Sequence, residues 1–200
     1  MKIFNKIKWI LGILIIFGLI VATNLIDRAN FIRVKDSAVT IYEDRLVAKD
    51  LILKLSNAIH TKELAIAKQN TAFFLDKNIK TNTEIDTYLI GFENTKLTKE
   101  EEAVFVQFKQ HLLQLKKAET IYLNTSFTNE EAIQNGIHKL KEDLNNLSKI
   151  QLIEGERQMS ISKKAIDKID LFTSIEIYIL IVLAIIVQGI ILYTPKKENV

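Results

Sequence analysis

The clearest structural signal in this chain of 200 residues is the stretch LTKEEEAVFVQFKQHLLQLKKAETIYL, residues 97–123. It opens with Thr98 and Glu101, which have the spacing of a capping box. In that motif a threonine hydroxyl accepts from the backbone N–H three residues on, and the glutamate reaches back. Apolar side chains then recur at helical spacing on one face. They are Val104, Phe108, Leu112, Leu115 and Tyr122. The stretch predicts an amphipathic helix that packs against other helices.

Similar apolar stripes lie on both sides of this stretch. The upstream stripe consists of Leu51, Leu55, Ile59 and Ile66. The downstream stripe consists of Ile133, Ile137, Leu140, Leu144 and Leu147, and it resumes at Ile161, Ala165 and Ile169. With one proline, six glycines and no cysteine, the chain has few residues that favour hairpin turns and no thiolate chemistry. We therefore predict an all-α fold, an antiparallel up-down-up-down four-helix bundle.

Capping signals suggest where these helices begin and end. Two further capping boxes pair Thr81 with Glu84 and Thr128 with Glu131. Asparagines at 78, 94 and 124 are candidate left-handed helix stops. We expect helices over residues 27–77, 81–94, 98–124 and 128–170. Because ascending and descending helices of a bundle must cover similar distances, the unequal predicted lengths leave the first turn open between Asn70 and Thr81.

Two long uncharged runs flank the predicted bundle. They are WILGILIIFGLIVATNLI, residues 9–26, and IYILIVLAIIVQGIILYT, residues 177–194. Each approaches the roughly 20 residues that a helix needs to cross a bilayer. Lysines lie outside both runs, and the positive-inside rule then places both termini in the cytoplasm. We expect cytoplasmic tails over residues 1–8 and 194–200, transmembrane helices over 9–26 and 171–193, and an extracytoplasmic bundle over 27–170, whose first and last helices continue into the spans.

A cleaved signal peptide is the competing interpretation of the first run, because a basic start and an apolar segment also fit one. The run is long for that purpose, and no small-x-small cleavage pattern is well formed. We therefore expect an uncleaved anchor. The lipid bilayer is an expected partner, and nucleic acid is not, because residues 27–170 hold equal numbers of acidic and basic side chains.

The order of these segments resembles a known family. A membrane helix precedes AVTIYEDRLVAKDLILKLSNAI, residues 38–59, in which IYEDRLV is the closest stretch, and residues 97–123 follow after a turn. This arrangement resembles the four-helix-bundle sensory domain of methyl-accepting chemotaxis proteins. The resemblance implies a periplasmic ligand-sensing module for signal transduction in chemotaxis, in a bacterial inner membrane. It also implies a homodimer that takes a small-molecule ligand.

The chain departs from that family after the second apolar run. No HAMP segment or cytoplasmic signalling domain follows Tyr193 in this sequence. We therefore expect a sensory module that transmits through a separate signalling or envelope protein. The alternative is a membrane-anchored structural bundle that docks other proteins without sensing a ligand.

The sequence offers no catalytic, cofactor or metal site, and it assigns no ligand-binding residue. His60, His111 and His138 flank apolar stripes, so we expect partly exposed imidazoles rather than metal ligands. No common catalytic motif is present, and we expect no enzyme activity.

Two polar features leave alternatives open. Arg45 could bind an anion, but a solvated or helix-pairing charge cluster with its acidic neighbours is the favoured interpretation. Polar residues at Gln151, Glu154 and Gln158 interrupt the last stripe. They indicate either a polar, ligand-responsive layer or a register shift that turns Leu152 and Ile153 inward, and the register shift is favoured.

Overall fold

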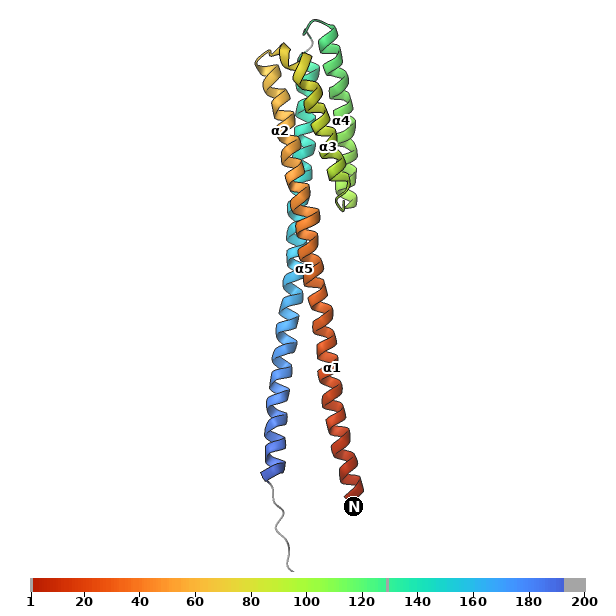
Figure 1. Ribbon diagram of the computed structural model, residues 1–200, viewed down its shortest axis with the longest axis vertical. Helices are drawn as coiled ribbons and strands as arrows, with labels where there is room; N and C mark the ends of the chain where they lie inside the picture. The colour runs from red at the N-terminus through yellow and green to blue at the C-terminus, as the bar shows by residue number, and fades with distance from the viewer. Residues whose placement is uncertain (1, 129, 193–200) are drawn as a thin grey trace, which may run out of the picture. The chain divides into compact units, whose positions relative to one another are not determined.

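The computed structural model describes the backbone of residues 2–128 and 130–192, and side chains from residue 12 to 186 except 13, 19, 129 and 184. Every regular element in these ranges is helical (Figure 1). The elements are α1 (Lys2–Thr40), the π-helical turn η1 (Ile41–Leu46), α2 (Val47–Ala67), the π-helical turn η2 (Phe73–Lys77), α3 (Asn78–Glu93), α4 (Lys99–Asn124) and α5 (Glu130–Leu192).

The chain divides into two compact units. Residues 38–159 form one, here called the bundle unit, and residues 1–37 with 160–200 form the other, here called the paired-helix unit. The helical run from α1 to α2 and the helix α5 each contribute residues to both units.

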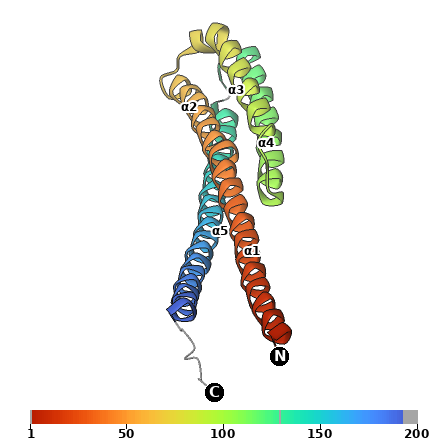
Figure 2. The ribbon, with the colours of Figure 1, turned by 60° about the horizontal axis from the view of Figure 1, so that its bottom comes forward.

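The bundle unit consists of α2, α3, α4 and the first part of α5, which lie side by side in Figures 1 and 2. Their facing stripes form one apolar core that runs along all four helices. Leu55, Phe108 and Leu140 are fully buried within it. Within the bundle unit the predicted stripes are confirmed, except that Leu51 and Val104 are only partly buried and Phe105 joins the core. The predicted resumption of the last stripe is wrong at Ile161, which is 37% exposed, and holds at Ala165, which is buried. Each helix therefore presents the face that its periodicity predicts.

The first turn of the bundle unit lies at residues 68–70 and not at residues 78–80. Asn70 N–H bonds to the Ala65 carbonyl at 2.8 Å and Gln69 N–H to the Ile66 carbonyl at 2.9 Å, the two bonds of a Schellman motif. Gln69 takes the left-handed conformation, with φ of 50°. The Asn70 side chain then caps the next helix by accepting from Phe73 N–H. The predicted helix over 27–77 was wrong at its end, and the earlier turn removes the mismatch in helix lengths.

Of the three predicted capping boxes, one is confirmed and one is wrong. The Thr98–Glu101 capping box is confirmed, with both of its hydrogen bonds present. The Thr81 box is wrong, because Thr81 lies inside α3 and donates its hydroxyl to the Lys77 carbonyl. In the third predicted box, the Thr128 hydroxyl donates to the Thr125 carbonyl. Asn129, which lies between Thr128 and α5, is outside the described residues, so this box stays a prediction.

The asparagines do not act as left-handed stops. Asn78 is buried at the start of α3, and Asn94 keeps right-handed helical dihedral angles. The turn after α4 contains the longer of the two bonds of a Schellman motif, from the Phe127 N–H to the Tyr122 carbonyl. Ser126 and Phe127 carry its positive φ angles. Ring contact between Phe127 and Tyr122, at 5.1 Å between centroids, holds this turn against the core.

In the paired-helix unit, α1 and α5 bury only narrow seams. The buried and half-buried residues recur at alternating spacings of three and four, the pattern of a coiled coil. They are Ile16, Ile20, Thr23, Asp27, Asn30, Val34 and Ser37 on α1, and Ser162, Ala165, Ile169, Phe172, Glu176, Ile179 and Leu183 on α5. The Thr173 hydroxyl donates to Asp27 Oδ2 at 3.4 Å and joins the two helices. The seam is therefore unusually polar for a helix pair.

Among the described residues, one helical stretch, Leu14–Ala67, is long and apolar enough to cross a membrane by length and composition, with 12% of its most apolar window buried. It contains most of the first predicted span. The second predicted span, residues 171–193, stays a prediction, as do the two-pass topology and the position of the termini. The predicted tail over residues 194–200 lies outside the described residues.

Candidate functional site

A buried charge network crosses the core of the bundle unit between α2, α3 and α4. Lys62 is fully buried, and its ammonium donates to Glu119 Oε1 at 2.5 Å, Asn78 Oδ1 at 2.5 Å and Asn82 Oδ1 at 2.9 Å. Asn78 in turn donates to Glu119 Oε2 at 2.9 Å. All three ammonium protons have acceptors, which is the condition under which a buried charge is tolerated.

Burial lowers the pKa of Lys62 from the ordinary lysine value, because desolvation penalises its charged form. The Glu119 carboxylate opposes that shift through its charge and its hydrogen bond. Loss of the carboxylate would therefore leave an ammonium in apolar surroundings with only amide oxygens to bind. These hydrogen bonds fix the positions of α2, α3 and α4 relative to one another along the bundle.

A second buried polar layer joins η1, α4 and α5. Arg45 Nη1 donates to Glu101 Oε1 at 2.6 Å and Nη2 donates to the Lys96 carbonyl at 2.9 Å. The Gln151 amide donates to the same Glu101 oxygen at 2.6 Å. The expectation of a solvated Arg45 is wrong, because its exposed fraction is 7%, whereas the expectation of helix pairing is confirmed.

The Gln151 position also settles the alternatives left open for the last stripe. Gln151 is 3% exposed, whereas Leu152 and Ile153 are 59% and 60% exposed. The favoured register shift was therefore wrong, and the polar layer is real. It persists because Glu101, which the capping box fixes at the start of α4, gives Gln151 a buried carboxylate to bind.

A third polar contact links α4 with α5 through Asp143. This carboxylate is 1% exposed, and it lies 2.6 Å from His111 Nδ1 and accepts from Gln107 Nε2 at 3.1 Å. His111 is half-buried, as the sequence predicts. Together the three contacts distribute buried polar groups along the whole bundle unit.

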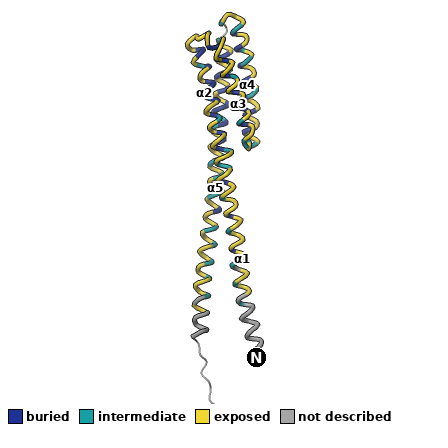
Figure 3. The backbone as a smooth tube through the Cα atoms, in the orientation of Figure 1, coloured by how far each residue is buried: buried dark blue, intermediate teal, exposed yellow. Residues whose placement is uncertain are grey.

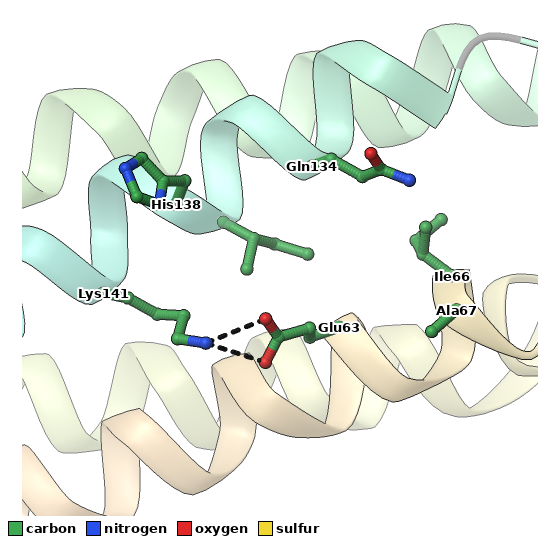
Figure 4. A pocket seen from close by; sticks show the side chains of 7 residues that line it. Glu63, Ile66, Ala67, Gln134, His138 and Lys141 are labelled. Carbon is green, nitrogen blue, oxygen red and sulfur yellow. Dashed lines mark hydrogen bonds and ion pairs between the residues drawn. The ribbon is translucent and has the colours of Figure 1, made fainter.

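An open pocket of about 310 Å³ lies between α2 and α5 (Figure 4). Ile66, Ala67 and Ile137 give it apolar walls, and Gln134, His138, Glu63 and Lys141 surround it with polar groups. Lys141 Nζ bridges both oxygens of Glu63, at 2.8 and 3.0 Å. Hydrogen bonds from Lys141 and then His60 lower the pKa of Glu63. The pocket therefore places a carboxylate, an ammonium and an imidazole within reach of one small molecule.

The three histidines do not converge on one point. His60 is exposed beside Glu63, His111 pairs with Asp143, and His138 is exposed at the Figure 4 pocket. Within the described residues, no group of three or more histidine, aspartate or glutamate side chains could hold a metal ion.

Sequence reasoning missed Lys62, Glu119 and Asp143 as buried residues. Their spacing could have predicted this burial, because each residue lies three or four positions after a residue of an apolar stripe. Lys62 lies three residues after Ile59, Glu119 lies four after Leu115, and Asp143 lies three after Leu140. A charged residue at a stripe position indicates a buried pair when another stripe offers the opposite charge at the same level.

Comparison with known proteins agrees with this architecture. A family model described as a four helix bundle sensory module for signal transduction matches residues 1–166. No curated protein and no solved structure matches the chain. The match confirms the resemblance to chemoreceptor sensory domains inferred from the sequence. The chain belongs to the family of four-helix-bundle sensory modules for signal transduction.

Proposed function

We propose that this protein is a membrane-anchored extracytoplasmic sensor whose small-molecule ligand binds the pocket between α2 and α5. Membership of a sensory family supports the class of function, and the pocket lined by Glu63, His138 and Lys141 supports its place. Such a family is not normally enzymatic. The antiparallel helix order, the two membrane spans and the periplasmic location of residues 27–170 belong to the same proposal.

The Lys141–Glu63 ion pair gives the proposed sensor its switch. A ligand with a carboxylate or an ammonium group competes for one partner of this pair, and so changes how α5 is held to α2. Because both helices continue into the paired-helix unit, a small displacement is carried along each of them. The seam of that unit contains several polar residues, so α1 and α5 lose little apolar packing when one slides along the other. We propose that a homodimer of this chain passes the displacement to a separate protein.

The observation that carries this proposal is the ion pair across an open pocket, and a binding screen tests it. The full chain in lipid nanodiscs is melted in the presence of amino acids, organic acids and sugars. A ligand that binds the folded form preferentially raises the melting temperature. We expect at least one such ligand, and Lys141→Gln should abolish its effect.

Lys109→Gln is the matched control, because Lys109 pairs with Glu93 on the surface away from this pocket. A ligand whose effect survives Lys141→Gln binds elsewhere and counts against the pocket. Absence of any stabilising ligand counts against the sensory function.

A second function is favoured by a separate observation. A groove of about 600 Å³ between α5 and the segment formed by η1 and α2 is lined by Leu46 and Leu53, which are 59% and 58% exposed. Exposed apolar side chains in a groove suit a docked protein segment. If the bundle only docks an envelope protein, crosslinking in intact cells recovers that protein through α2 or α5, and the ligand screen stays negative.

A further inference from the structure

We infer a second ligand site beside Arg45, which takes a small carboxylate with an apolar body. A cavity of about 330 Å³ lies between α5 and the segment formed by η1 and the start of α2. It shares no lining residue with the Glu63–Lys141 pocket. The inference therefore stands whether or not the proposed sensory pocket binds a ligand.

Arg45 is one of the residues that line this cavity, and its guanidinium is not fully satisfied. Its two terminal nitrogens bind Glu101, Gln151 and the Lys96 carbonyl. Its Nε is buried and has no hydrogen-bond partner. Buried donors nearly always have acceptors in folded proteins, so an orphan donor in a side chain that is 93% buried indicates a missing acceptor.

The backbone at Arg45 is also unusual. Arg45 lies in η1, where the Val47 N–H bonds back to the Tyr42 carbonyl, five residues earlier. Such π-helical turns are rare, and they occur frequently at functional sites. The turn changes the helical phase locally, so that Arg45 is directed into the interior while Tyr42 and Leu46 remain exposed.

The other lining residues define the ligand class. Ile41, Leu152 and Met159 are apolar, and Gly155 leaves open space where a side chain would otherwise stand. Lys49 adds a second cation at the rim. Glu101 balances the charge of Arg45 within their ion pair, so the attraction of an incoming anion depends on the free Nε–H donor and on Lys49.

The remaining acid at this cavity orients the ligand. Glu156 is exposed at the rim and repels a carboxylate there, so the head group must enter toward Arg45 with the apolar body outward. The volume equals that of about ten liquid water molecules, at roughly 30 Å³ each, which suits a molecule the size of benzoate or hexanoate.

Access to the guanidinium requires a local movement, because Nε is covered. Leu46, Leu152 and Met159 line the cavity and are 59–60% exposed. Side chains with so much exposed surface lose little buried area when they move aside. The site can therefore admit a ligand without unfolding the core.

The test measures the melting temperature of the full chain in nanodiscs with benzoate, hexanoate or benzylamine. At about ten times its dissociation constant, benzoate should raise the melting temperature by about 3–6 °C. Benzylamine has a similar body and the opposite charge, and it should give no rise. Equal shifts with both compounds, or no shift with either acid, would overturn the inference.

Gly155→Leu supplies the decisive variant. A Cβ at this position meets nothing within 4 Å, so the variant keeps the fold while its larger side chain fills the cavity. We expect it to abolish the benzoate shift, and Arg45→Lys to weaken it. If Gly155→Leu keeps the shift while Glu63→Gln loses it, benzoate binds the Figure 4 pocket and the Arg45 site is wrong.

Discussion

The two units of this chain bury different kinds of side chain. The bundle unit buries large apolar groups along all four of its helices, with charged pairs between them. Figure 3 shows buried positions on each of these helices. Among the described side chains of the paired-helix unit, the buried ones are Thr23, Asn30, Ser37 and Ala165. Most of its large apolar residues are exposed instead, and Leu14, Phe17 and Leu25 are each about 60% exposed.

This difference indicates different surroundings for the two units. The bundle unit buries a continuous apolar core by its own folding, as a water-exposed domain must, although side chains such as Leu53 and Ile79 stay exposed. In the paired-helix unit, residues 14–26 and 177–186 expose apolar side chains around the seam, which is the arrangement expected of helices that face lipid, whereas residues 27–37 and 160–171 expose charged side chains. Stability should therefore depend on core packing in the first unit and on the proposed bilayer in the second.

The largest effect should come from the core of the bundle unit. Phe108→Ala removes a fully buried ring and should cost about 4 kcal/mol of unfolding free energy. Leu25→Ala in the paired-helix unit removes a side chain that is 61% exposed, and should cost less than about 1 kcal/mol. Denaturant unfolding of the full chain in mixed micelles, followed by circular dichroism, measures both. Similar losses would contradict the comparison.

Charge removal in the same core should be nearly as costly. Glu119→Leu leaves the Lys62 ammonium buried without its carboxylate and should cost about 3 kcal/mol. The double variant Lys62→Met with Glu119→Leu should recover most of this loss, because no buried charge remains. The same unfolding measurement applies. A double variant as unstable as the single one would mean that the network contributes packing that apolar groups cannot replace.

These residues mark how far the sequence predicts the structure. Leu115, Ile137 and Leu140 could be placed in the core, because apolar periodicity depends on local spacing alone. Lys62 and Glu119 could not, because their burial depends on two helices that bring opposite charges to one level. The helix lengths allowed a turn at Asn70, but the capping signals placed it later, because the Schellman motif at Gln69 contains no glycine and has no compositional signal. Asn78 was misassigned as a stop for a related reason, since its partner Lys62 is sixteen residues away.

The same limit applies to the candidate site. The polar residues that line the Figure 4 pocket are ordinary helix-surface residues in the sequence, and only the packing of α2 on α5 brings Glu63 and Lys141 together. Arg45 was noticed, but its burial depends on Glu101 and Gln151, which lie 56 and 106 residues away along the chain. Long-range pairing of this kind is fixed by the fold and not by local spacing.

A smaller effect is expected from the polar seam of the paired-helix unit. Asn30→Leu replaces a buried amide at a seam position by an apolar side chain, and should stabilise the helix pair by about 1–2 kcal/mol. Ala29→Leu is the control, because Ala29 is exposed beside the seam. Unfolding in mixed micelles compares the two variants. Destabilisation by Asn30→Leu would show that the amide makes contacts that the helix pair needs.

The smallest effect concerns the ion pair at the pocket. The pKa of Glu63 is lowered in the folded protein, so its pairing stabilises the fold above the unfolded value of 4.5 and is lost as the pH falls through the folded pKa. Because the pair is partly exposed and screened, we expect a loss of only about 0.5 kcal/mol. The loss of unfolding free energy between pH 6 and pH 3 should be about 0.5 kcal/mol larger in the parent chain than in Glu63→Gln. An identical pH dependence would mean that the pair contributes nothing.

The most direct test of the account is the side of the membrane on which the bundle unit lies. The chain contains no cysteine, so Gln110→Cys provides a single thiol at an exposed position on α4. In bacterial spheroplasts a membrane-impermeant maleimide should label this thiol before lysis, whereas Lys197→Cys should react only after lysis. Labelling of residue 110 only after lysis would place the bundle unit in the cytoplasm and contradict the account.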